Sequence, residues 1–329
     1  MSEDTIGLAS LPVGMAVRRT RHRGSSVGDR VILGVFGLAA WMVLLVVAAL
    51  FVTLCIAAWP AIKTVGWQAV HTVEWDPNNG RFGVMSFVFG TLVTSAIALV
   101  LAAPIGLGAA LLLAEIAPRR VASPLAMLIE LLAAVPSIVY GIWGLFILVP
   151  VMRTYIEPAL SKSLGFVPLF HGYFYGVGFL TAGVLLAIMV LPTVTAIARD
   201  IFEAVPREQR EAMLALGATK WEMLTRAVIP YARSGIIGAL VLALGRALGE
   251  AMAVVMVIGN KPAITASLFS PGYSMAAVLA NEFTEATGQQ YLAVLIGIGS
   301  LLFVLSMLVN IIARVLVWSV AGRLRGARI

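Results

Sequence analysis

The chain is poor in cysteine, histidine and charge, and each shortage excludes a class of protein. Its 329 residues include one cysteine, Cys55, so no disulfide can form within the chain. The three histidines are scattered and no Cys/His spacing typical of a metal site occurs, which predicts no metal centre. Charged residues make up 12%, whereas an average soluble domain has about a quarter. With 60% hydrophobic residues, the chain is predicted to be an integral membrane protein.

Sequence motifs of nucleotide binding and catalysis are also absent. No G-x-x-x-x-G-K-[ST] segment occurs, so the chain is not expected to hold ATP phosphates itself. No G-x-S-x-G or H-E-x-x-H segment occurs, and no apolar segment carries a pair of aspartates. These absences argue against an ATPase and against an enzyme embedded in the membrane.

Six apolar segments are long enough to cross a bilayer, since a spanning helix needs about 20 mostly apolar residues. An isolated strand would leave backbone polar groups unsatisfied in lipid, so each segment is predicted to be a helix and the fold to be all-α and polytopic. Pro104, Pro136 and Pro192 fall within spans and are expected to kink them. The predicted spans are 31–59, 86–116, 124–152, 177–198, 235–259 and 289–318.

Lysine and arginine are unequally shared between the two sets of loops. With both ends of the chain inside, the inner segments hold sixteen of the 23 basic residues and the outer segments hold five. Because cytoplasmic loops collect Lys and Arg, this bias predicts a multi-pass protein of the cell membrane with both termini in the cytoplasm. The net charge of +7 is therefore interpreted as a topology signal, which argues against nucleic-acid binding.

Two regions are predicted near the start of the chain. Residues 1–30 are basic and contain no apolar run, which predicts a cytoplasmic tail ahead of a membrane domain over 31–329. The segment 31–59 is too long for the core of a signal peptide, and no small-x-small cleavage pattern follows it. This segment is therefore expected to stay as a membrane anchor.

A long polar segment, about 199–230, separates the fourth and fifth spans on the inner side. Pro206 suits the first turn of a helix and Gly217 suits a left-handed end, which predicts a helix between them. Thr219 and Glu222 have the spacing of a capping box, so a second helix is expected to begin there. A folded, charged loop of this kind indicates a surface shaped for another protein; a helical hairpin without a partner is the alternative.

Two charged residues, Arg246 and Glu250, fall near the middle of the fifth predicted span, where a charged side chain costs about 2.5–3.5 kcal/mol. A spacing of four places both on one helix face, where they can pair. Gly245 and Gly249 form a G-x-x-x-G stripe beside them, which favours close packing by a neighbouring helix. The pair either locks the bundle or belongs to an ion pathway, and its depth favours the pathway. An arginine fork suits a phosphate-like oxyanion.

Part of the inner segment resembles the EAA loop of permease subunits of ATP-binding-cassette importers, whose pattern is E-A-A, three residues, G, nine residues and I-x-L-P. Four residues match this pattern in register: Glu211, Ala212, Gly217 and Pro230. Three residues depart from it and stay apolar: Met213, Ala227 and Ile229. The resemblance implies that this coupling loop inserts a short helix into a cleft of a separate ATPase subunit. That subunit would bind ATP and Mg²⁺, and this chain would need no cofactor.

Longer segments are similar to the phosphate-specific permeases of the PstC type, over most of 31–318. They are 131–141, 245–254 and 280–283, of which the second is the most specific. This resemblance implies six transmembrane helices of the type I importer fold, and uptake of inorganic phosphate driven by ATP hydrolysis in another subunit. In the family, the residues matching Arg246 and Glu250 are important for transport. The implied partners are a homologous PstA-type permease, a dimeric ATP-binding subunit and an extracytoplasmic phosphate-binding protein.

Alternatives of two classes stay open. Within transport, the cargo could be another oxyanion such as sulfate or molybdate, which competition of uptake by those anions would reveal. Outside transport, the chain could be a membrane scaffold, which purification without an ATPase would favour. A membrane-embedded enzyme is the least favoured alternative, because the motifs of such enzymes are missing.

Overall fold

The computed structural model describes residues 27–66 and 68–325, and the chain divides after Leu50 into two compact units. The predicted tail lies outside the described residues up to position 26, so its boundary with the membrane domain stays a prediction. Residues 27–50 are the first part of α1, Val27–Thr64, a continuous helix. With a mean hydropathy of 2.8 over its candidate span, α1 suits the interior of a bilayer.

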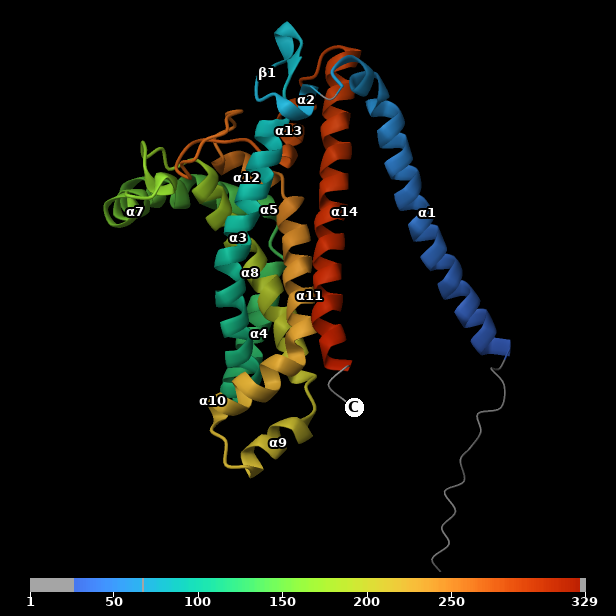
Figure 1. The fold of residues 1–329 in the computed structure, drawn as a ribbon, viewed down its shortest axis with the longest axis vertical. Helices are drawn as coiled ribbons and strands as arrows, with labels where there is room; N and C mark the ends of the chain where they lie inside the picture. Colours follow the sequence, from blue (N-terminus) through green and yellow to red (C-terminus); the bar gives the residue numbers. More distant parts are fainter. Residues whose placement is uncertain (1–26, 67, 326–329) are drawn as a thin grey trace, which may run out of the picture. The chain divides into compact units, whose positions relative to one another are not determined.

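The second unit, from Phe51 onward, contains a bundle of long helices (Figure 1). The long helices that follow α1 are α3, Met85–Leu111; α8, Phe179–Glu203; α11, Ile229–Leu248; and α14, Gln289–Arg325. The contact between α3 and α8 is the most extensive, and α11 packs on α3, α8 and α14. Buried apolar side chains such as Phe87, Leu185 and Ile298 form the core between these helices.

Six helices of the described residues are long and apolar enough to cross a membrane, as the sequence predicted. They are Val31–Thr64, Met85–Ile116, Ser137–Leu164, Phe179–Glu203, Lys220–Leu248 and Gln289–Val315. The first, second, fourth and sixth lie close to the predicted spans, because continuous apolar sequence sets their lengths. The third and fifth differ from the predicted 124–152 and 235–259.

The third span is broken where the sequence predicted a kink. α4, Arg119–Ala133, ends before Pro136, and α5, Ser137–Trp143, begins after it. Pro136 has a ψ of 137°, which is not helical, and its ring disfavours the helical conformation of the preceding residue. Pro104 and Pro192, by contrast, lie inside the continuous helices α3 and α8. The prediction of one helix over 124–152 is therefore wrong.

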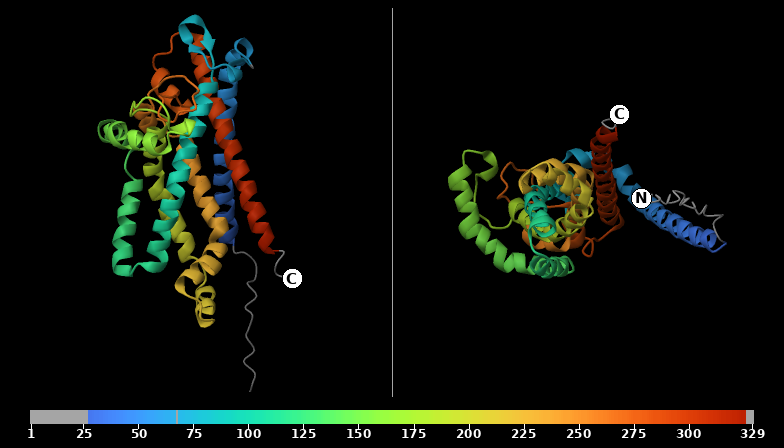
Figure 2. Two further views of the ribbon diagram at one scale, coloured as in Figure 1. Left: turned by 60° about the vertical axis from the view of Figure 1, so that its left-hand side comes forward. Right: turned by 90° about the horizontal axis from the view of Figure 1, so that it is seen from below.

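Beyond this break the chain forms short helices in an arc, drawn in green in Figure 2. A buried carboxylate fastens the arc: Glu157 accepts a hydrogen bond from the Gly176 amide (3.1 Å) in the loop that follows. The helices of the arc are α5, α6 (Val149–Val151) and α7 (Glu157–Leu164), joined by π-helical turns at Gly144–Leu148 and Met152–Ile156 and followed by a 3₁₀ turn at Pro168–Phe170.

A small hairpin lies between α1 and α3. Strands β1 (Trp75–Asp76) and β2 (Arg81–Phe82) pair antiparallel around a 3₁₀ turn, Pro77–Asn79, and α2 (Gln68–His71) precedes them. Gly80 closes the turn with a φ of 69°, a conformation that favours glycine. This hairpin is the only sheet among the described residues, so the all-α fold class is correct in substance.

A carboxylate on α13, Met275–Glu282, ties the hairpin to the bundle. Glu282 accepts hydrogen bonds from three aromatic side chains: the Trp75 indole (2.9 Å), the Tyr273 hydroxyl (3.0 Å) and the Tyr291 hydroxyl (2.5 Å). Burial raises the pKa of Tyr273, so its hydroxyl stays protonated and donates. Glu282 thereby joins the hairpin, the segment before α13 and the start of α14.

We expect Glu282→Ala to lower the melting temperature of the purified protein by about 4–8 °C. The substitution leaves three partly buried donors without their acceptor, and a hydrogen bond to a charged group contributes about 1.5–3 kcal/mol. Thermal unfolding followed by tryptophan fluorescence measures the shift. Glu285→Ala, which removes an exposed carboxylate in the turn just after α13, is the control. Equal melting temperatures for the two variants would contradict the role given to Glu282.

Candidate functional site

The polar segment between α8 and α11 folds as its sequence predicted. α9, Arg207–Ala215, lies within one residue of the predicted helix at each end. Gly217 follows it with a φ of 81°. Its amide donates to the Leu214 carbonyl (3.0 Å), and the next amide donates to the Met213 carbonyl (3.2 Å). These two bonds form the Schellman motif, which requires a left-handed residue at position 217.

The second helix of the segment, α10 (Lys220–Met223), begins with the predicted capping box. The Thr219 hydroxyl accepts from the Glu222 amide (3.3 Å), and the Glu222 carboxylate accepts from the Thr219 amide (3.0 Å). A π-helical turn, Leu224–Val228, then leads into α11. A small buried cluster holds these elements on the ends of α3 and α8. Its members are Ala110, Ala198, Phe202, Val205, Met223, Leu224, Val228 and Ala232.

The residues that matched the EAA pattern lie mainly on the surface of this segment. Glu211, Ala212 and Gly217 are exposed. Met213 is half buried and packs on the buried cluster, and Pro230 is half buried in the first turn of α11. The structure thus brings the first four together on or just after α9 and places Pro230 at the base of the segment.

Large apolar side chains are exposed on the same segment. Leu214, Leu216 and Trp221 are 46%, 84% and 71% exposed. Burying such side chains is favourable by about 25 cal/mol per Å² of apolar surface, so this face is suited to contact with another protein. A short helix with outward apolar side chains has the form that helix-in-groove recognition uses.

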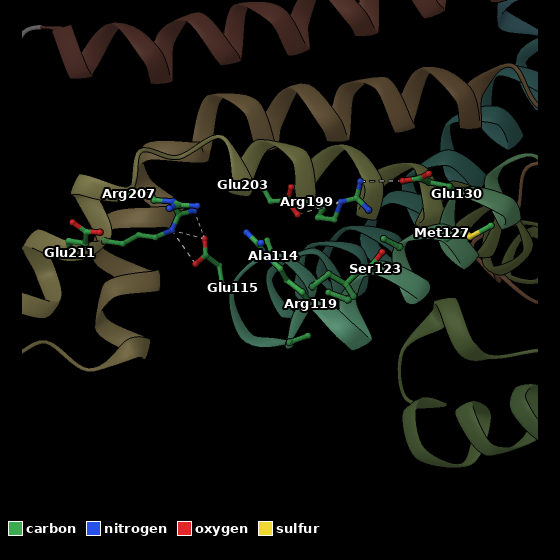
Figure 3. A pocket seen from close by; sticks show the side chains of 15 residues that line it. Ala114, Glu115, Arg119, Ser123, Met127, Glu130, Arg199, Glu203, Arg207 and Glu211 are labelled. Atoms are coloured by element: carbon green, nitrogen blue, oxygen red, sulfur yellow. Dashed lines mark hydrogen bonds and ion pairs between the residues drawn. The ribbon is translucent and has the colours of Figure 1, made fainter.

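Two ion pairs that no local sequence pattern indicates lie along one cavity, one involving α9 and the other joining α8 to α4 (Figure 3). Arg210, on α9, lies 2.6 Å from Glu115 in the π-helical turn Leu112–Ile116 that follows α3. Arg199, on α8, lies 3.2 Å from Glu130 on α4. Residues of both pairs line a cavity of about 860 Å³ among α4, α8, α9 and this turn. The partners are 95 and 69 positions apart in the sequence, so spacing alone could not find them.

The fifth span ends earlier than the predicted 235–259. α11 stops at Leu248, and a new helix, α12 (Met252–Val257), begins after a short break. Arg246 therefore lies in the last turn of α11 and Glu250 lies in the break, instead of both lying in the middle of one helix. Non-helical backbone at membrane depth is tolerated where it lines a cavity or is covered by protein.

The break also separates the two charged side chains. Among the ion pairs of the described residues, none joins Arg246 to Glu250. The Glu250 carboxylate instead accepts a hydrogen bond from the Ala253 amide (3.4 Å) at the start of α12. A bond between a side chain and a nearby backbone amide competes with the hydrogen bonds of a continuous helix. The Glu250 bond caps the start of α12 and so favours a break after α11. The predicted pairing across one helix face is not found.

The glycine stripe beside Arg246 is not covered closely by the described part of the chain. A Cβ on Gly245 would lie 3.8 Å from the Asn310 side chain of α14, and a Cβ on Gly249 would lie 3.8 Å from the Gly245 carbonyl. Both are ordinary van der Waals distances. Arg246 itself is exposed and Glu250 is half buried. The packing role of the two glycines thus stays a prediction.

The arrangement favours binding and movement over covalent chemistry. Within the described ranges, no group of three or more His, Cys, Asp or Glu residues is placed to hold a metal ion. An exposed guanidinium at a helix break can offer paired N–H donors to an anion. An exposed helix beside a buried ion pair can pass a displacement from a bound protein to the bundle.

Known proteins are similar to this chain in sequence and in fold. The family model described as binding-protein-dependent transport system inner membrane component matches residues 102–321. The chain is 41% identical to the phosphate transport system permease protein PstC of Mesorhizobium japonicum, over 95% of this chain and 97% of that one. It is 43% identical to the PstC protein of Haemophilus influenzae, over 85% and 90%.

The fold is similar to that of a bacterial alginate ABC transporter solved with its periplasmic protein, with a TM-score of 0.55, 15% identity, and 86% of this chain and 94% of that chain covered. Six apolar helices in the described residues agree with a multi-pass membrane protein of the type I importer permease fold. The chain therefore belongs to the binding-protein-dependent transport system inner membrane component family, in the group of the PstC permease proteins.

Proposed function

We propose that this chain is a permease subunit of an ATP-binding-cassette importer of inorganic phosphate, in which it forms the transmembrane pathway with a second permease. The observation that carries this proposal is the identity of 41–43%, over most of the chain, to two proteins named phosphate transport system permease. The family match and the importer fold support the same assembly. The second permease is a homologous PstA-type chain, and an extracytoplasmic binding protein delivers the phosphate.

ATP hydrolysis takes place in a separate, dimeric ATP-binding subunit, which also holds the Mg²⁺. The docking element is α9 with the turn at Gly217, where Glu211, Ala212 and Met213 stand on a short helix. The exposed Leu216 and Trp221 supply the apolar surface for a groove in that subunit. This placement puts the loop and both chain ends in the cytoplasm, and it puts the hairpin on the side of the binding protein.

Arg246 and Glu250 belong to the phosphate pathway. In another class, the secondary transporters, the cargo site is typically formed by broken membrane helices. The break between α11 and α12 has a comparable form. The Arg246 guanidinium is exposed on this chain and presents donors that match phosphate oxygens. The carboxylate of Glu250 is held at the start of α12 and forms no ion pair with Arg246, so the guanidinium donors stay available to phosphate.

The transport cycle is one of alternating access. ATP binding closes the ATPase dimer and displaces α9, the permease pair opens outward, and phosphate enters from the binding protein. Hydrolysis returns the pair to the inward-facing state and releases phosphate into the cytoplasm. The chain forms no covalent bond with its cargo, so its contribution lies in binding and in movement.

Reconstitution tests this proposal. The chain, its second permease and the ATPase are placed in liposomes with binding protein outside and ATP at the ATPase side. We expect uptake of radiolabelled phosphate that requires ATP and withstands an excess of sulfate or molybdate. An ATPase that binds but does not hydrolyse ATP is the control. Competition by sulfate or molybdate would reassign the cargo, and no uptake by the complete complex would contradict the proposal.

A further inference from the structure

The coupling helix α9 is held by few apolar contacts. None of its residues is buried, and Leu214 points an apolar side chain outward. Met213 is its contact with the buried cluster around Phe202. A helix of nine residues is marginal by itself, so polar contacts must contribute to its position.

One arginine of α9 supplies these contacts. The Arg210 guanidinium donates through Nε to both carboxylate oxygens of Glu115 (3.1 and 3.2 Å) and through Nη2 to one of them (2.6 Å). Nη2 also donates to the Phe202 carbonyl (2.7 Å), and Nη1 donates to the Val205 carbonyl. Carbonyls at a helix end lack intrahelical donors, so Arg210 satisfies the end of α8 as well. We call this group the Arg210–Glu115 fork.

The fork is largely shielded from water. The side chains of Arg210 and Glu115 are 17% and 7% exposed. A paired guanidinium and carboxylate fix both distance and orientation, because the planar fork can bind in one geometry. Three segments therefore meet at one rigid contact: α9, the end of α8 and the π-helical turn after α3.

The cavity described above lies next to the fork, between α9 and α4. The space of about 860 Å³ separates α9 from α4, and Figure 3 shows Arg207 and Glu211 of α9 and Ser123 of α4 on its walls. α4 is joined instead to α8, through Glu130 and Arg199. A push on α9 thus meets the fork first, and it reaches α4 through the turn that holds Glu115 and through α8.

The other end of α8, away from the fork, is bonded to the end of α12 and to the segment after it. At that end the amides of Phe179 and Leu180 donate to the carbonyls of Ser270 (3.2 Å) and Leu268 (2.8 Å), in the segment after α12. The amide of Gly178 donates to the Val257 carbonyl (3.0 Å), which ends α12. One helix therefore runs from the fork to the elements that follow Arg246 and Glu250.

We propose that the Arg210–Glu115 fork is the link that makes α8 and the end of α3 move with α9 when the ATPase displaces it. Arg210 and Glu115 are positioning residues that set the ratio of phosphate moved to ATP hydrolysed. This inference rests on the proposed function for its driving force. Loss of the fork leaves α9 attached through the chain but free to turn into the cavity, so hydrolysis proceeds without opening the pathway.

Transport by the full reconstituted complex tests the link. We expect Arg210→Gln and Glu115→Gln each to lower phosphate uptake by about tenfold, the size of a typical coupling effect. ATP hydrolysis should stay within about twofold of wild type, as after a surface substitution. Arg120→Gln, at an exposed arginine outside the cavity, is the matched control and should leave both rates unchanged.

Each outcome of that experiment bears on the link. If the wild-type complex transports phosphate and the Arg210→Gln complex does so within about twofold of that rate, the link is overturned and the proposed function stays intact. If Arg210→Gln does not assemble, Arg210→Lys replaces it, since lysine keeps the charge and loses the planar fork. An unchanged ratio of phosphate to ATP in the lysine variant would equally overturn the link.

A distance measurement tests the link without any cargo. Spin labels on cysteines at Glu208, on α9, and at Ile116, beside the fork, are introduced into a chain carrying Cys55→Ser; both positions are exposed. With the fork intact, we expect the same narrow distance distribution in the ATP-free and ATP-bound complex. Arg210→Gln should broaden it. Equal distributions with and without the substitution would overturn the link, whatever the complex transports.

Discussion

We expect Arg246→Gln to abolish phosphate uptake while the complex of permeases and ATPase still assembles. Glutamine removes the charge and the paired N–H donors that the proposed pathway uses. Two charge-assisted hydrogen bonds, each worth about 1.5–3 kcal/mol, correspond to at least about a hundredfold loss. Because Arg246 is exposed and forms no ion pair with Glu250, the substitution leaves no buried carboxylate unpaired. Uptake assays on the purified, reconstituted complex measure the loss.

Arg314→Gln is the matched control for this variant. Arg314 is also an exposed arginine on a long helix, α14, and it lies in no proposed pathway. We expect uptake within about twofold of wild type after this substitution. Normal uptake by Arg246→Gln would remove the residue from the pathway, whereas failure of the complex to assemble would support a purely structural role.

We expect Gly217→Asp to uncouple the ATPase from transport. A non-glycine residue in the left-handed conformation costs about 1–3 kcal/mol, and the Schellman motif at this position requires that conformation. The added charge would also face the proposed groove of the ATPase. No atom lies within 4 Å of a Cβ at this position, so crowding within the chain does not contribute. We expect uptake to fall by about tenfold or more, with weaker copurification of the ATPase.

Gly80→Asp separates the strain from the docking effect. Gly80 also has a positive φ, 69°, and open space around its Cβ position, but it lies in the hairpin next to α2. Both variants carry the same charge and similar backbone strain. Gly80→Asp should retain the ATPase and transport at near the wild-type rate. Similar losses in both variants would mean that strain alone, not docking, explains the effect at Gly217.

Local features of the fold could be predicted from sequence because they depend on neighbouring residues. The left-handed turn at Gly217 and the capping box of Thr219 and Glu222 each involve residues within a few positions of one another. Four spans could likewise be placed, because an apolar run sets its own length. The third and fifth spans could not, because the helix stops while the apolar sequence continues. Near Gly249, the end is marked by a bond from the Ala253 amide to the Glu250 side chain, inside a run of otherwise apolar residues.

The residues of the candidate site also fall into two groups: those that sequence spacing could find and those that depend on how the helices pack. The EAA residues on α9 are consecutive or nearly so, and sequence spacing brings them onto one short element. Arg210 comes immediately before Glu211 and has no carboxylate three or four positions away. Its partner, Glu115, comes from the far end of another span. Contacts of this kind depend on how α3 and α8 pack, which no window of the sequence contains. The pathway roles of Arg246 and Glu250 remain predictions.

The separation of Arg246 from Glu250 has a consequence for selectivity. A guanidinium in tight contact with a carboxylate has a weak outward field, whereas one without that contact keeps its full positive potential at the chain's surface. Coulomb attraction grows in proportion to the charge of the anion, so a dianion is drawn twice as strongly as a monoanion at the same distance. If Arg246 lines the pathway as proposed, this break would therefore rank anions by their ionisation state as well as by their shape. Phosphate, unlike sulfate, changes that state near neutral pH.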